Sequence, residues 1–217
     1  MKQAPSDADD GAPIERLRAA TERIRTLTRD FTARGVRHDD ADDELIGTFH
    51  TDDAIGFDPF PMLMLLKRTQ ADYAVFGQVA GIMHGSQEPT GDLDILWDGS
   101  DSVTPQMAQL FENAGVILRD DHSVLSSDYR AALRGPKAYF EGLGSAGDLC
   151  TPRLPWGSLD VGWFLRRKVW ARNDSLAVPF LCLNDLISMR RAVADRPKHH
   201  RRLNELEELA RLRAKTA

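Results

Sequence analysis

Near the N-terminus, apolar residues recur at steps of three and four positions. This spacing predicts an amphipathic helix over residues 14–31. The apolar stripe covers only about two heptads, fewer than a coiled coil needs, so we expect the helix to pack on the core of the protein. Its apolar members are Leu17, Ala20, Ile24, Leu27 and Phe31.

The acidic residues 37–58 show no clear period, and we expect a linker or surface segment leading to a short helix around residues 62–67. Further along, short β-prone runs alternate with helical stretches and glycine-containing turns. The predicted strands cover residues 73–76, 92–97 and 116–118. The predicted helices cover residues 78–84, closed by Gly85, and 104–113, capped by Thr104 and ended at Gly115.

A hairpin is predicted next, with strands over residues 149–154 and 158–163 joined at Pro155-Trp156-Gly157. From Phe164 onward the pattern is helical, with one helix after Asn184 and another from about Pro197. The fold class expected from these elements is α+β, a mixed β-sheet core flanked by helices, with a C-terminal helical portion. The predicted units are an N-terminal helix and acidic linker (1–60), a mixed core (61–163) and a basic helical region (164–217).

Composition limits the class of protein. The chain has 217 residues, of which 42% are hydrophobic and 28% charged, so it can bury a core and is not fibrous or collagen-like. The longest apolar run, residues 60–66, is far below the ~20 residues of a membrane-spanning helix, and residues 1–10 lack the pattern of a secretory signal. We therefore expect a cytoplasmic protein without a membrane partner. Cys150 and Cys182 are too few for a disulfide framework, so we expect both to be reduced and structural.

The net charge of −5 hides an asymmetry. Residues 161–217 carry 13 Lys and Arg against 6 Asp and Glu, although the whole chain is acidic. A basic unit of this kind is typical either of a solvated helical face or of a surface for a phosphate-bearing partner. The residues that would form such a surface are Arg190, Arg191, Arg196, Lys198, Arg201 and Arg202.

Two carboxylates are predicted to share one strand. Asp92 and Asp94 are two residues apart, so they project from the same face of the strand while Leu93 and Ile95 face the core. Carboxylates that repel each other in this way suit divalent cations, and carboxylate oxygens are the ligands that Mg²⁺ prefers. Two metal ions about 3.5–4 Å apart can share an aspartate, so the spacing fits metal-assisted phosphoryl chemistry.

Gly77 stands between the predicted strand 73–76 and the helix that follows it. The first N–H groups of a helix have no partners within it and form a natural phosphate site, which would face the same ligand as the metals. A third carboxylate is expected from a neighbouring strand. We predict Asp160, because Leu159 and Val161 would face inward around it, with Asp148 as the alternative.

The order Gly77, helix, His84-Gly85, Thr90, Asp92-x-Asp94 and a later Asp160 resembles the DNA polymerase beta-like nucleotidyltransferase superfamily, in particular its small bacterial branch that includes toxin–antitoxin proteins. Arg196-Pro197-Lys198 is similar to an Arg-Pro-Lys element of that branch. The resemblance covers roughly residues 70–100 and 158–210 and makes residues 61–163 a nucleotidyltransferase core.

The resemblance implies a function and a site. The chain would be a Mg²⁺-dependent enzyme that transfers a nucleotidyl group from an NTP, such as ATP, to an acceptor hydroxyl. Asp92, Asp94 and Asp160 would be the catalytic residues and would hold two Mg²⁺ ions. Gly77, Gln78, Thr90 and Lys198 would bind the nucleotide. The acceptor, whether tRNA, a protein side chain or a small molecule, stays open, as does a cognate toxin or antitoxin partner.

The chain departs from the pattern at Gln78, where the family usually has Ser or Gly. A small residue lets the backbone approach phosphates closely, so a longer side chain favours a second hypothesis, a catalytically silent binding module. A third hypothesis is a phosphohydrolase that uses the same carboxylates. For His84 we expect a structural role at a helix end, for His199 a solvated helix start, and for Trp156 and Trp163 core packing rather than base stacking.

Overall fold

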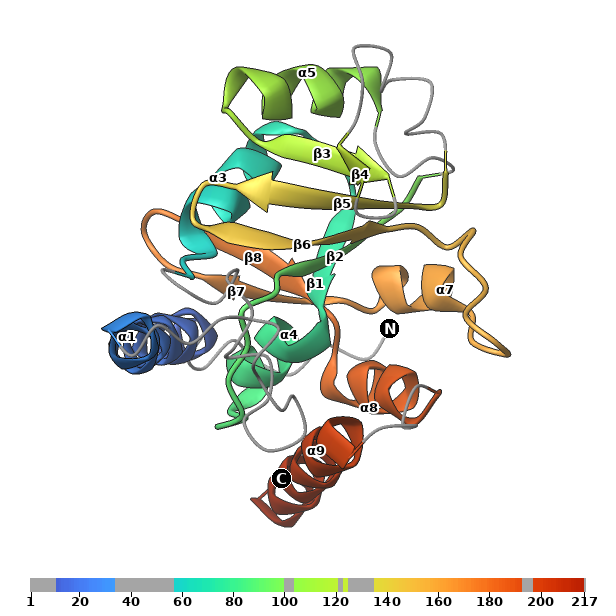
Figure 1. Cartoon of the computed structure of the whole chain (residues 1–217). Helices are drawn as coiled ribbons and strands as arrows, with labels where there is room; N and C mark the ends of the chain where they lie inside the picture. The colour runs from blue at the N-terminus through green and yellow to red at the C-terminus, as the bar shows by residue number, and fades with distance from the viewer. Residues whose placement is uncertain are drawn as a thin grey trace.

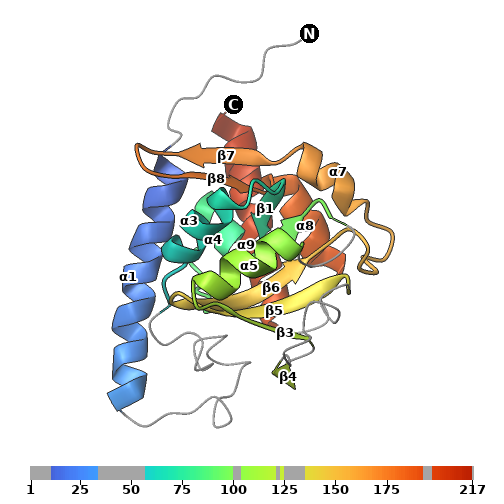
Figure 2. The same cartoon turned by 90° about the horizontal axis from the view of Figure 1, so that it is seen from above.

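The computed structural model describes residues 11–33, 57–99, 104–120, 123–124, 135–192 and 197–216. They form an α+β fold, with helices packed around one mixed sheet of strand order β4-β3-β5-β6-β2-β1-β8-β7 (Figures 1 and 2). The strands are β1 (Tyr73–Phe76), β2 (Asp94–Trp97), β3 (Ile117–Asp120), β4 (Ser123–Val124), β5 (Lys137–Gly142), β6 (Ser145–Cys150), β7 (Val169–Arg172) and β8 (Ala177–Phe180). The helices are α1 (Ala12–Ala33), α3 (Phe60–Arg68), α4 (Gly77–His84), α5 (Pro105–Asn113), α7 (Val161–Arg166), α8 (Leu183–Ala192) and α9 (Pro197–Thr216).

The central strands alternate between two apolar layers. Val75 and Ile95 belong to the larger layer, which includes the buried face of α1 and residues of α3, α4 and α5. Ala74, Leu96 and Cys150 face the second layer, which α7 and Met189 of α8 help to cover. This period of two is the pattern of strands that are covered on both faces.

The N-terminal half agrees with the prediction. Helix α1 buries Ile14, Leu17, Ala20 and Ile24 in the core, as its apolar stripe indicates, whereas the side chains of Leu27 and Phe31 lie outside the described part. Strand β1, helices α3, α4 and α5, and the turn at Gly85 lie where they were predicted. Asp92 lies just before β2, in a bridge with Ala146. Most of the acidic segment 37–58 lies outside the described residues.

Two predictions of the C-terminal third are wrong. Residues 158–163 are not a strand, because Asp160 caps α7 and its side chain accepts a hydrogen bond from Trp163 N at 3.1 Å. The helical spacing of Val161, Phe164 and Leu165, all buried, prevails over the local alternation. Residues 169–180 are not helical either, since they form the hairpin β7–β8 at the edge of the sheet.

Among the described residues, no helix combines the length and apolar character needed to cross a membrane.

Candidate functional site

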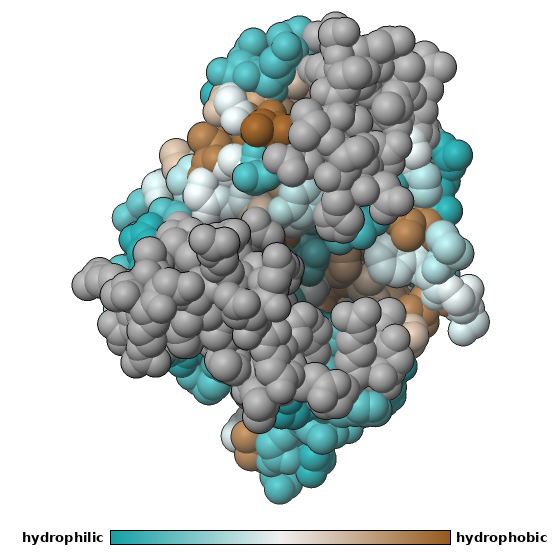
Figure 3. Space-filling model, viewed as in Figure 1, coloured by the Kyte–Doolittle hydropathy of each residue, from teal (hydrophilic) through white to brown (hydrophobic). Residues whose placement is uncertain are grey.

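A cavity of about 210 Å³ opens between the ends of β1 and β2 and the helices α8 and α9. Figure 3 shows a hollow in the middle of this face, with hydrophilic and hydrophobic side chains in it. Five residues predicted for the site line the cavity: Gly77, Gln78, Thr90, Asp92 and Asp94. The remaining walls come from Phe76, Trp156, Leu186, Met189, Arg190, His199 and Arg202.

The acidic wall is formed by Asp92 and Asp94. Burial, followed by the neighbouring carboxylates Asp92 and Asp148, raises the pKa of Asp94 to about 8, although Arg190 and Lys137 oppose the shift. Thr90 is buried, and its Oγ1 accepts a hydrogen bond from Asp92 N at 3.3 Å, which helps to fix the chain entering β2.

The third carboxylate near this pair is Asp148. Strands β2 and β6 pair in parallel, with Ile95 opposite Leu149 and Asp92 opposite Ala146, so the same register places Asp94 beside Asp148. Asp160 does not line the cavity, because it caps α7.

Asp148 also has a cationic partner. Lys137 Nζ lies 2.8 Å from Asp148 Oδ2, from the adjacent strand β5. No local sequence pattern predicts this pair, because it depends on the pairing of strand β5 with strand β6.

Gly77 makes close contact with the acidic wall. Its φ of +63° is a conformation that favours glycine, and an added Cβ would lie 1.9 Å from Asp94 Oδ2. The carboxylate of Asp94 therefore lies directly against the first residue of α4, and a side chain at position 77 would displace it.

The opposite wall is basic. Arg190 of α8 and Arg202 of α9 are 9% and 5% exposed. Burial, followed by the nearby charge of Arg202, lowers the pKa of Arg190 to about 10, although Asp94 opposes the shift. Arg202 Nη2 donates to Pro89 O at 2.9 Å, whereas Arg190 has neither a hydrogen bond nor an ion pair among the described residues.

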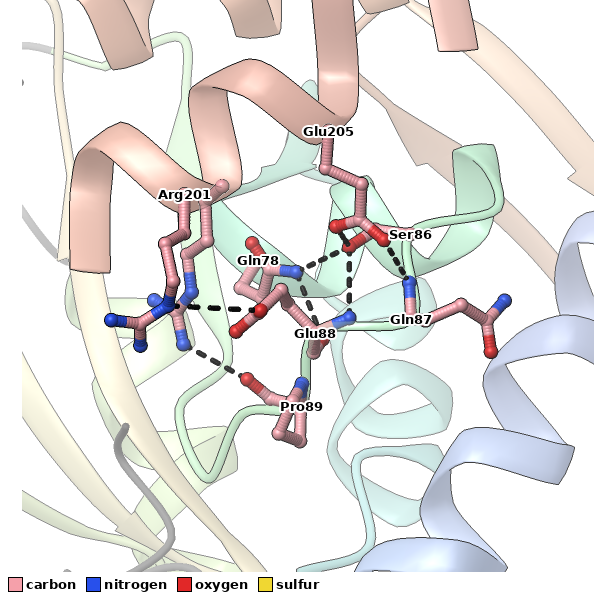
Figure 4. A network of polar contacts seen from close by, with 8 residues as sticks. Gln78, Ser86, Gln87, Glu88, Pro89, Arg201 and Glu205 are labelled. Carbon is pink, nitrogen blue, oxygen red and sulfur yellow. Dashed lines mark hydrogen bonds and ion pairs between the residues drawn. The ribbon is translucent and has the colours of Figure 1, made fainter. Parts of the chain in front are cut away.

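The side chain of Gln78 is bonded to the turn that follows α4. Its Nε2 donates to Ser86 Oγ at 2.8 Å and to Glu88 O at 2.9 Å (Figure 4). Its Oε1 is buried without a hydrogen-bond partner among the described residues. The side chain thus braces the turn that precedes Asp92.

Helix α9 also contacts this turn, through Glu205 and Arg201. Glu205 accepts hydrogen bonds from Ser86 Oγ and, at 2.6 Å, from Gln87 N, and Arg201 lies 3.9 Å from Glu88 (Figure 4). The role of Glu205 was not predicted, because its partners are more than a hundred residues away. Lys198 lies in the first turn of α9, and its side chain is outside the described part; His199 lines the cavity.

His84 has the structural role expected of it. The buried ring bonds through Nε2 to Leu181 O at 2.8 Å, and Arg213 Nη1 lies 3.3 Å from Nδ1. Burial lowers the pKa of His84 to about 4, so the ring is neutral at pH 7 and donates from Nε2.

The apolar wall carries two aromatic rings. Phe76 and Trp156 meet edge to face with centroids 5.9 Å apart, and Trp156 Nε1 donates to Thr151 O at 2.9 Å. The expectation of core packing is wrong for Trp163, which is 48% exposed on α7. Neither Trp163 nor Asp160 lines the cavity.

Comparison with protein-family models finds none that matches the chain, and comparison with curated protein sequences finds no relative. Within the described part, no group of three His, Cys, Asp or Glu side chains is arranged to hold a metal ion.

Proposed function

We propose that the protein is a Mg²⁺-dependent nucleotidyltransferase, which moves a nucleotidyl group from an NTP to an acceptor hydroxyl in the cytoplasm. The observation that supports this proposal is the cavity with a carboxylate pair on one wall and two buried arginines on the other. An NTP bound to a divalent cation carries both charges that such a cavity would neutralise.

The donor set fits a divalent cation at Asp92 and Asp94. Burial and the neighbouring carboxylates raise the pKa of Asp94 in spite of Arg190 and Lys137, and a bound cation would add to the compensation of its charged form. Asp148 is paired with Lys137 and would join this set only by leaving it. Bound there, Mg²⁺ would stabilise the negative charge that develops on the reacting phosphate.

The chain's own residues have separate tasks. Arg190 and Arg202 would hold the β- and γ-phosphates, and Thr90 would fix Asp92. The edges of Phe76 and Trp156 would contact the base. The acceptor oxygen would bond to the α-phosphorus, the bond from that phosphorus to the bridging oxygen would break, and pyrophosphate would leave. Asp148, once released from Lys137, would take the hydroxyl proton.

The second candidate is a silent binding module, such as a toxin–antitoxin component. Gln78 favours this hypothesis, because its buried contacts with Ser86 and Glu88 integrate the side chain into the fold. The two candidates differ in one respect. An enzyme binds an NTP through Mg²⁺ and Asp94, whereas a module does not require either.

The test is transfer of label from each α-labelled NTP, with Mg²⁺, to total tRNA or cell protein, alongside release of pyrophosphate. Label that moves with the wild type and not with Asp94→Asn supports the proposal. If neither label transfer nor pyrophosphate release occurs, nucleotidyl transfer is wrong and the silent module replaces it.

A further inference from the structure

Exposed aromatic residues gather on one short stretch of the chain. Six large hydrophobic side chains are exposed in the described part, and three of them fall within eight residues: Trp163, Val169 and Trp170. The same stretch is rich in cations, and residues 161–172 contain four Lys and Arg and no Asp or Glu. We call the set Trp163, Arg166, Arg167, Trp170 and Arg172 the tryptophan–arginine surface.

The fold turns these side chains outward. Helix α7 buries Val161, Phe164 and Leu165, which leaves Trp163, Arg166 and Arg167 exposed. Strand β7 is an edge strand that buries Ala171, so Trp170 and Arg172 lie on its outer face. Figure 2 shows that α7 and β7 follow each other along one edge of the molecule.

Each exposed indole carries a stacked guanidinium. The Cζ of Arg166 lies 4.8 Å from the ring centroid of Trp163, and that of Arg172 lies 5.5 Å from the centroid of Trp170. Arg167 also contacts Trp163, at 5.6 Å, but forms an ion pair with Asp185. Arg166 and Arg172 have no carboxylate partner among the described residues, so both charges remain available to a ligand.

We propose that the tryptophan–arginine surface binds single-stranded RNA. Bases stack on exposed aromatic rings irrespective of sequence, and arginines neutralise the phosphates between them. Two Trp–Arg pairs on consecutive elements offer this alternation twice. An anionic membrane fits less well, because inserting the indoles into lipid would also bury the guanidinium groups stacked on them.

The surface adjoins the cavity through α7. The buried residues of α7 share one apolar cluster with Trp156 and Met189, which line the cavity. An RNA strand bound along α7 would therefore lie beside the apolar wall of the cavity. If the proposed nucleotidyl transfer is correct, the acceptor hydroxyl belongs to RNA. Only this assignment of the acceptor rests on the proposed function; the proposal of RNA binding does not.

The test measures polarisation of a fluorescein-labelled oligouridylate, with the full chain at low and moderate salt. Wild type is expected to bind, and Trp163→Ala/Trp170→Ala to lose at least tenfold in affinity. Replacing Arg166 and Arg172 by Gln should lower the slope of log affinity against log salt by about 1.4, since each phosphate contact in a single strand contributes about 0.7. The matched control is Met64→Ala, which removes an exposed apolar side chain on α3 and should bind as wild type.

Two further measurements separate the possible failures. Asp94→Asn should bind RNA with the affinity of the wild type. If the wild type binds RNA but transfers no label, the proposed nucleotidyl transfer is wrong and the proposal of RNA binding stands. Thermal unfolding of the double tryptophan variant should match wild type, because both rings are exposed, and Trp163→Phe/Trp170→Phe should retain most of the affinity. No binding by wild type, equal affinity of the double alanine variant, or stronger binding to anionic vesicles than to RNA would overturn the proposal.

Discussion

Helix α4 has a set of buried polar groups at each end, and the two sets differ in how well their charges are matched. At its C-terminal end, His84 and Ser86 are bonded to Leu181, Arg213 and Glu205. At its N-terminal end, Asp94 lies beside two other carboxylates with its pKa raised to about 8, and Arg190 lies across the cavity without a hydrogen bond in the described part.

We interpret this difference as one between a structural set of residues and the site of the proposed function. Buried polar groups that are fully bonded hold elements together, whereas buried charges that are only partly compensated cost stability and are typical of sites where a ligand supplies a further partner. We therefore expect substitutions at the C-terminal end of α4 to change stability, and substitutions at the cavity to change ligand binding.

The largest effect is expected from Gly77→Ala, which would lower both stability and ligand binding. The new Cβ would strain a residue with φ of +63° and collide with Asp94 Oδ2. We expect a loss of about 3 kcal/mol or more in the free energy of unfolding, measured in urea, together with loss of NTP binding. Gly162→Ala in α7, where an added Cβ lies 3.4 Å from Asp160, is the tolerated control. A stable, nucleotide-binding Gly77→Ala would show that the close approach is not required.

The second effect is pH dependence from His84. Its pKa falls from 6.5 in the unfolded chain to about 4 in the folded protein, so the unfolded state binds more protons between these values. The contribution is fully present above pH 6.5 and is lost as the pH falls towards 4, by about 2 kcal/mol between pH 7 and 5. Urea unfolding at pH 7 and pH 5 measures this loss of unfolding free energy. The loss should be about 2 kcal/mol smaller in His84→Asn than in the wild type. Equal losses in both proteins would contradict a neutral buried ring.

Glu205→Gln tests the bonded set directly. Glu205 accepts two hydrogen bonds from the turn at Ser86 and Gln87, and replacing its charged acceptor should cost about 1.5 kcal/mol in the free energy of unfolding. Affinity for NTP should change little. Glu208→Gln, whose carboxylate is exposed and paired only with Arg211 in the described part, should cost less than about 0.5 kcal/mol. If Glu205→Gln and Glu208→Gln lowered the free energy of unfolding equally, the hydrogen bonds of Glu205 would not stabilise the turn more than an exposed ion pair does.

The smallest effect on stability is expected from Arg190→Met. The arginine is buried without a hydrogen bond in the described part, so its replacement should leave the midpoint of thermal unfolding unchanged or raise it. Affinity for Mg²⁺–NTP, measured by calorimetry, should fall at least tenfold, since a hydrogen bond to a charged group contributes about 1.5–3 kcal/mol. Arg191→Met, which removes an exposed arginine paired with Glu207, should leave affinity unchanged. A destabilised Arg190→Met with normal affinity would assign Arg190 to the structural set.

Local spacing predicted the half of the site that is close in sequence. Gly77, Thr90, Asp92 and Asp94 lie within eighteen residues, and strand and helix periods place them on one cavity. Asp160 was misplaced because Leu159 and Val161 alternate like a strand, while the cap and the spacing of Val161, Phe164 and Leu165 favour a helix.

The other half depends on contacts between distant segments. Lys137 meets Asp148 only because β5 pairs with β6, and Glu205 meets Ser86 only because α9 packs on the turn after α4. The hairpin β7–β8 was missed because an edge strand with exposed Val169, Trp170 and Arg172 lacks the apolar alternation of a half-buried strand. Such pairings are set by tertiary packing, which no local period records.

The most direct test of the central claim is calorimetric binding of a non-hydrolysable NTP to wild type and Asp94→Asn, with and without Mg²⁺. The account predicts binding by wild type that requires Mg²⁺, and loss of that binding in Asp94→Asn, whose fold at pH 8 should be at least as stable because a buried carboxylate with a raised pKa has been removed. Binding that is indifferent to Mg²⁺ and to Asp94, or absent from the wild type, would contradict it.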